Sequence, residues 1–148
     1  MLILKNKNDI PCGLDVGYEI CKTQSKLFLY AIRHDYDDND FIKKYMESQF
    51  CNQKMDALYS RFQLMNAAYI MSYLLDEISP ETSKKHYDED AIEWIGWMYR
   101  YTQLRLEVPS KQIYKTLSLN NMLVYYKSMS GENTEYFIEQ IQTKFETD

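Results

Sequence analysis

The chain has 148 residues, of which 45% are apolar, 15% aromatic and 26% charged. This length suits one domain, and the apolar fraction is sufficient for a core and excludes a chain that is disordered throughout. The 17 basic and 22 acidic residues give a formal net charge of -5, which makes binding to nucleic acid unfavourable.

We expect neither a membrane segment nor a secretion signal. No stretch approaches the roughly 18 consecutive apolar residues of a membrane span, and the apolar run at 2–4 is too short for a signal peptide. We therefore predict a cytoplasmic protein. Cys12, Cys21 and Cys51 are widely spaced and form no zinc-site pattern with histidine, so we interpret them as buried free thiols. The sequence predicts neither a metal nor a cofactor.

The first half of the chain predicts helices separated by a polar turn. Residues 1–13 have the pattern of an extended lead, and the apolar spacing over 14–33 predicts a helix. The acidic turn that follows places Asp38 where it can cap a helix over 41–52. The apolar spacing over 61–78 predicts a further helix, which ends there because the proline at position 80 disfavours helical backbone before it.

The stretch 88–107 predicts the central helix. It opens with three acidic residues, which are favourable at a helix N-terminus. Its polar positions recur three or four residues apart and form one narrow strip: Glu89, Glu93, Gly96, Arg100, Gln103 and Glu107. The remainder is mostly apolar, whereas a surface helix is apolar on one side only. We expect this helix to lie in the middle of the domain, or to have half of its apolar surplus covered by another chain.

Short helices are predicted for the C-terminal part. Ser110 can cap a helix over 111–117, a second follows over 120–127, and the last spans 132–145. Low glycine and proline content argues against an all-β fold. The predicted fold is a single compact all-α domain spanning 1–148, with about five to seven helices around the nearly all-apolar helix 88–107.

Aromatic residues are the strongest functional signal. Trp94, Trp97 and Tyr101 share one face of the predicted central helix, and Tyr114 and Tyr126 extend the aromatic set toward the C-terminus. Both faces of that helix can pack inside the same domain. Alternatively, one face is a partner groove or a homodimer surface, because tryptophan and tyrosine dominate interface hot spots. On this alternative we predict Trp94, Trp97, Tyr101, Tyr114 and Tyr126 as partner contacts.

Two polar clusters suggest other functions. Asp35, Asp37 and Asn39 are spaced like the start of a calcium loop, but the glycine and glutamate that such a loop requires are missing, so helix capping is the preferred interpretation. Arg33 and His34, with nearby carboxylates, can form an acid–base cluster and support an alternative as a small helical enzyme or toxin. His86 lies in a polar link and is expected to face solvent.

A third alternative is a transcriptional regulator. The helix–turn candidate over 110–126 has lysines at positions 111 and 115, with another just beyond it at 127, but no arginine. A DNA-reading helix is usually strongly basic, so this candidate is weaker than the others.

The C-terminal half also carries a family resemblance. Its order is a long helix with Trp94-Ile95-Gly96-Trp97-Met98-Tyr99-Arg100-Tyr101, then Ser110-Lys111-Gln112-Ile113-Tyr114-Lys115, Tyr125-Tyr126 and Glu135-Tyr136-Phe137-Ile138. This order resembles small helical proteins of unknown function in Gram-positive bacteria, encoded in toxin–antitoxin-like loci beside ADP-ribosyltransferase-like proteins. Those proteins commonly carry a His-Thr pair where this chain has Met129-Ser130-Gly131. The resemblance implies a small neutralising or regulatory partner and transfers no catalytic residue.

Together these observations predict a non-enzymatic protein-binding module, antitoxin-like or regulatory, in a toxin–antitoxin or mobile-element system. It would act by occlusion, with an apolar helix surface docked over the active cleft of a toxin-like protein. The enzyme, the transcriptional regulator and the homodimer stay open as alternatives.

Overall fold

A computed structural model describes residues 16–80 and 86–146, and within them the fold is all-α, with no strand. The α-helices are α1 (Val16–Arg33), α2 (Asp38–Glu47), α3 (Ala67–Leu74), α4 (Glu89–Leu106), α5 (Ser110–Thr116), α6 (Leu119–Met129) and α7 (Thr134–Ile141). Among the described residues, no helix has the length and apolar character needed to cross a bilayer. The predicted all-α class is confirmed, while the expected lead over 1–13 lies outside the described residues.

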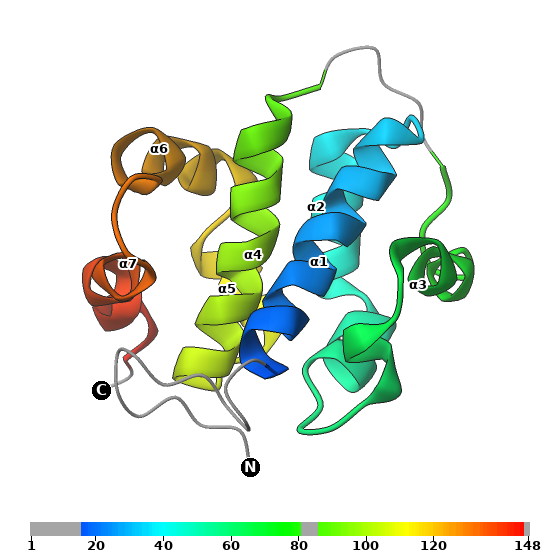
Figure 1. Ribbon diagram of the computed structural model, residues 1–148, viewed down its shortest axis with the longest axis horizontal. Coiled ribbons are helices and arrows are strands. Elements are labelled where there is room, and N and C mark those ends of the chain that lie inside the picture. Colours follow the sequence, from blue (N-terminus) through cyan, green and yellow to red (C-terminus); the bar gives the residue numbers. More distant parts are fainter. Residues whose placement is uncertain (1–15, 81–85, 147–148) are drawn as a thin grey trace.

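Helices α1 and α4 form the centre of the domain. In Figure 1 they lie side by side, with α2 and α3 toward one side and α6 and α7 toward the other. The bounds of α4 follow from its ends: Asp88 accepts a hydrogen bond from the backbone N–H of Asp90, and Glu107 adopts the left-handed conformation that closes many helices. The predicted central helix over 88–107 is confirmed.

The polar strip of α4 is buried along its middle. Gly96, Arg100 and Gln103 all face the protein interior. The side chain of Gln24 on α1 donates to the carbonyl oxygen of Gly96 at 2.9 Å, and Ser25 donates to that of Glu93 at 2.9 Å. The strip therefore marks the seam with α1, where polar groups on the two helices satisfy one another.

Helix α2 starts earlier than predicted. Its N-cap lies one residue before the predicted cap, and the helix itself begins three residues before the predicted start. Asp37, in extended conformation, accepts the N–H of Asp40 and caps the helix, so Asp38 lies inside it. Asp38 is 1% exposed, and its carboxylate accepts from the backbone N–H of Tyr87 and lies 2.6 Å from Nδ1 of His86. His86 and Tyr87, just before α4, are therefore bound to the N-terminal end of α2.

The helices expected over 41–52 and 61–78 are both interrupted. After α2 ends, a π-helical turn covers η1 (Cys51–Met55), and a 3-10 turn covers η2 (Arg61–Leu64). Asn66 then takes an extended conformation and accepts the N–H of Tyr69, which starts α3 anew. Asparagine is strongly preferred as an N-cap, so Asn66 separates η2 from α3 even though the apolar residues of this segment are spaced as in one helix.

Helix α5 obtains its N-terminal cap from a distant segment. The prediction that Ser110 caps this helix is wrong, because Ser110 is its first residue. Asp56 accepts both the backbone N–H and the hydroxyl of Ser110, and Asn52 accepts the N–H of Lys111. In contrast, α6 and α7 are capped locally by Ser118 and Asn133.

Candidate functional site

Both tryptophans of the chain lie at one surface groove. The groove runs between α1, α4 and the region joining α6 to α7, and it encloses about 650 Å³. We call it the tryptophan groove and define it by Tyr18, Lys22, Lys26, Asp90, Glu93, Trp94, Trp97, Tyr126, Ser130 and Glu132. Trp94 and Trp97 are half-buried, whereas Tyr18 at its edge is exposed.

Trp94 and Trp97, which form the aromatic floor of the groove, pack against other aromatic rings. Trp97 stacks on Tyr101 with ring centroids 5.2 Å apart, and Tyr18 meets Trp97 edge-on at 6.1 Å. Trp94 makes edge-to-face contacts with Tyr126 at 5.6 Å and with the buried Phe137 at 5.5 Å. Such contacts hold ring orientations, so the floor presents a preformed surface.

Charged residues of opposite sign line the two sides of the groove. Lys22 and Lys26 come from α1, whereas Asp90 and Glu93 come from α4 and Glu132 from the turn before α7. Within the described part of the chain, no ion pair is formed by these side chains. The groove thus has a basic side on α1 and an acidic side on α4 and the turn before α7.

The predicted contact residues do not all meet at this groove. Trp94, Trp97 and Tyr126 line it together, but Tyr101 is 2% exposed and lies beneath Trp97. Tyr101 therefore supports the surface and does not form it. Tyr114 lies at a separate hollow, which it shares with Lys111 and Lys115 of α5 and Glu47 of α2.

Arg33 and His34 line a different cavity of about 480 Å³, together with Lys26, Tyr30 and Glu93. The Arg33 guanidinium makes two hydrogen bonds to Glu89, at 3.1 and 2.7 Å, and these bonds lower the pKa of that carboxyl. The His34 ring stacks on Tyr30 with centroids 3.8 Å apart, and its Nδ1 lies 2.8 Å from the Tyr30 carbonyl oxygen. The cavity thus gathers a guanidinium and an imidazole that already have partners.

A buried arginine is the main polar feature that sequence reasoning missed. Arg100 is 0% exposed and donates hydrogen bonds to Gln24 at 3.1 and 2.7 Å, Asp56 at 2.6 Å, Gln103 at 2.9 Å, the Met55 carbonyl at 3.1 Å and the Cys51 sulfur at 3.4 Å. Tyr45 donates to Gln24 in turn. Burial is the largest single effect and lowers the pKa of Arg100, but Asp56, Cys51 and Tyr45 together outweigh it and hold that pKa above its usual range. The signal available in the sequence was a single cation in an otherwise apolar stretch.

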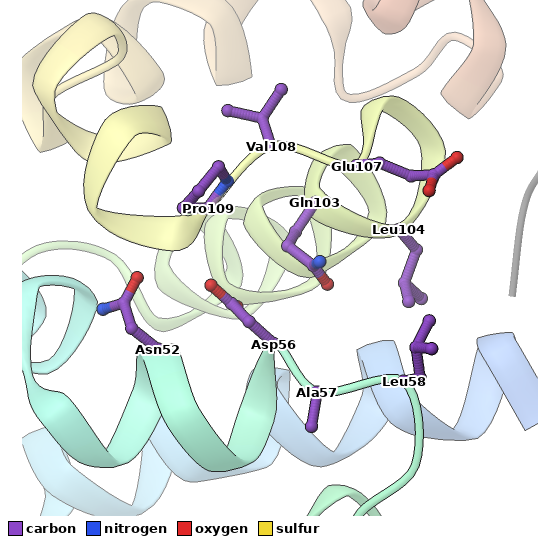
Figure 2. A pocket seen from close by; sticks show the side chains of 9 residues that line it. All are labelled: Asn52, Asp56, Ala57, Leu58, Gln103, Leu104, Glu107, Val108 and Pro109. Atoms are coloured by element: carbon purple, nitrogen blue, oxygen red, sulfur yellow. The ribbon is translucent and has the colours of Figure 1, made fainter. Parts of the chain in front are cut away.

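The Arg100 network reaches the surface at a hollow of about 330 Å³. Figure 2 shows Asp56 and Gln103 on facing sides of this hollow, Leu58 and Leu104 directed toward one another, and Glu107 pointing away. The Asp56 carboxylate already accepts from Arg100 and from the start of α5. We therefore assign these polar groups to holding η1, α4 and α5 together.

The cysteines and carboxylates form no metal centre in the described ranges, 16–80 and 86–146. Cys21 and Cys51 are buried free thiols, as predicted, and burial raises the pKa of both. Cys12 lies outside the described residues. Asp37, one of the residues spaced like a calcium loop, caps α2.

Comparison with known proteins identifies no relative, since no family model, curated protein or solved structure matches the chain. The resemblance to proteins of toxin–antitoxin-like loci therefore stays a hypothesis based on the residues quoted for it.

Proposed function

We propose that this protein is a protein-binding module and that the tryptophan groove is its docking surface. The observation that carries the proposal is the position of Trp94 and Trp97, half-buried at the same open groove with Tyr18 and Tyr126 beside them. Large aromatic side chains at a preformed surface are the usual energetic centre of an interface, because they bury much apolar area at little entropic cost.

The mode of action we propose is occlusion. A module that docks through such a groove can cover the active cleft of a partner without contributing a catalytic group. The family resemblance extends this proposal to an antitoxin-like or regulatory role toward a toxin-like protein in the cytoplasm.

The proposal can be tested with a photo-crosslinking amino acid placed at Ser130, which lines the groove at the C-terminal end of α6. The matched control places the same amino acid at Asn120, near the start of α6 and outside the groove. Both side chains are exposed. In the native host we expect a discrete protein adduct from position 130 only. An adduct between two copies of the chain would identify a homodimer. Equal adducts from both positions, or none from either, would contradict the proposal.

A second arm tests the contribution of the aromatic floor. Trp97→Ala should weaken partner binding by about 2 kcal/mol, since a central tryptophan is a typical hot spot. Trp97→Phe retains a ring that can stack on Tyr101 and should weaken binding less. Thermal unfolding of both variants separates lost contact from lost fold: unfolding of Trp97→Ala at room temperature would show that the residue serves the core.

An enzymatic function is a second candidate, supported by the cavity that brings Arg33 and His34 together with Lys26 and Glu93. The bonds of Arg33 to Glu89 favour a structural role for this pair. If the His34→Ala variant retains every cellular phenotype of the wild type, this candidate is rejected.

A further inference from the structure

The charges around the tryptophan groove are unevenly placed. The three carboxylates, Asp90, Glu93 and Glu132, outnumber the two lysines, and the whole chain carries a net charge of -5. At the Tyr126 end the surroundings are negative: the pKa of the Tyr126 phenol is raised by burial and, after that, by Asp88 and Asp90. Among the described residues, the charged groups that act on this phenol are carboxylates. An anionic ligand group would therefore be repelled at this end of the groove.

The aromatic rings add to the preference for a cation. The face of an indole or phenol ring is electron-rich and attracts an ammonium or guanidinium group, tryptophan most strongly. Trp94 and Tyr126 lie edge-to-face, 5.6 Å between centroids, at the same groove as Asp90 and Glu132. An arginine is well suited to such a site because its planar group stacks on rings while its N–H groups bind carboxylates.

We propose that the segment bound in the tryptophan groove is basic, with an arginine or lysine side chain of the partner held against Trp94 and Tyr126 and paired with Asp90 and Glu132. This inference rests on the proposed protein-binding function and specifies the chemistry of the partner. Lys22 and Lys26, on the α1 side, then face the remainder of the bound segment. Because they repel further positive charge, the bound segment cannot be a continuous run of basic residues.

The test uses a phage-displayed library of short random peptides selected against the full-length protein. Peptides that are enriched are synthesised and titrated into the protein while tryptophan fluorescence is recorded. Because both tryptophans of the chain line the groove, their emission reports directly on its occupancy. We expect enriched peptides to carry arginine or lysine beside an apolar residue, and to shift the emission.

Two matched double variants then locate the charge preference. Asp90→Asn with Glu132→Gln should lower the affinity of these peptides about tenfold, because it removes both carboxylates that pair with the basic side chain and leaves the rings in place. Lys22→Gln with Lys26→Gln, on the opposite side, should leave the affinity unchanged or raise it. All four residues belong to the rim, and urea unfolding of each variant confirms that the fold is retained.

The outcomes separate the two proposals. Peptides that shift the tryptophan emission but are neutral or acidic, or that bind the Asp90→Asn/Glu132→Gln variant equally well, overturn the basic segment and leave the docking surface intact. Failure to enrich any peptide that shifts the emission counts against the basic segment. When position 130 also gives no crosslink, the docking surface itself is rejected.

Discussion

Substitution of Gly96 by alanine tests whether α1 and α4 are in backbone contact. A β-carbon at this position would lie 3.0 Å from the Cα of Ser25, 3.1 Å from the carbonyl oxygen of Gln24 and 3.1 Å from Cδ2 of Phe28. Two of these atoms belong to the α1 backbone, so the helices must separate by a few tenths of an ångström to admit the methyl group. That movement also stretches the hydrogen bond from Gln24 to the Gly96 carbonyl, now 2.9 Å.

The magnitude follows from two opposing effects. Alanine is favoured over glycine within a helix by about 1 kcal/mol, whereas overpacking a close-packed core costs about 1–3 kcal/mol. We expect Gly96→Ala to lower the free energy of unfolding by about 1 kcal/mol in urea titrations. Gly131→Ala is the matched control: nothing lies within 4 Å of its added methyl group, so its stability should stay equal or rise slightly. A Gly96→Ala protein more stable than the wild type would refute the backbone contact.

Two further predictions concern buried and half-buried charges. Arg100→Met should lower the free energy of unfolding by about 3–5 kcal/mol, because it leaves Asp56 and other buried acceptors without their cation. Arg33→Met removes an exposed ion pair and is the control, so it should lower the free energy of unfolding far less. Equal losses in the two variants would contradict the special role of Arg100. Asp38 raises the pKa of His86 above its ordinary 6.5, chiefly through their hydrogen bond, so protonated His86 stabilises the fold below about pH 6.5. This contribution is lost as pH rises through the elevated pKa, so the stability difference between wild type and His86→Gln should shrink as the pH is raised above about 6.5. A difference that does not change with pH would contradict the link to Asp38.

The central helix was predictable because its signals are local. Asp88 and the acidic residues after it mark the start of α4, and the long apolar stretch marks its place in the interior. The same local reasoning was incomplete elsewhere. It joined 61–78 into one helix, because apolar spacing alone does not show that Asn66 takes an extended conformation and begins a new helix.

The orientation of the polar strip was not predictable from α4 alone. Apart from Gln103, the partners of Arg100 come from positions 24, 51, 55 and 56, which are far away along the chain. Periodicity does not reveal whether a polar strip faces water or polar groups on another helix. The start of α5 is a similar case, since its cap comes from Asp56, 54 residues before Ser110.

The candidate groove was predictable only in part. Trp94 and Trp97 are three residues apart on one helix, so their common face follows from helix geometry. Tyr126 joins them through tertiary packing, and Tyr101, one turn beyond Trp97, is covered although it shares the same face. Exposure depends on which neighbours lie above each ring, which is a property of the assembled domain.

The cap that Asp56 and Asn52 provide for α5 constrains how this protein can be divided or recombined. A fragment that carries only the C-terminal helices would lack the Asp56 and Asn52 side chains that accept the first amide groups of α5. A chimera that exchanges halves with another helical protein must therefore bring positions 52 and 56 along with position 110.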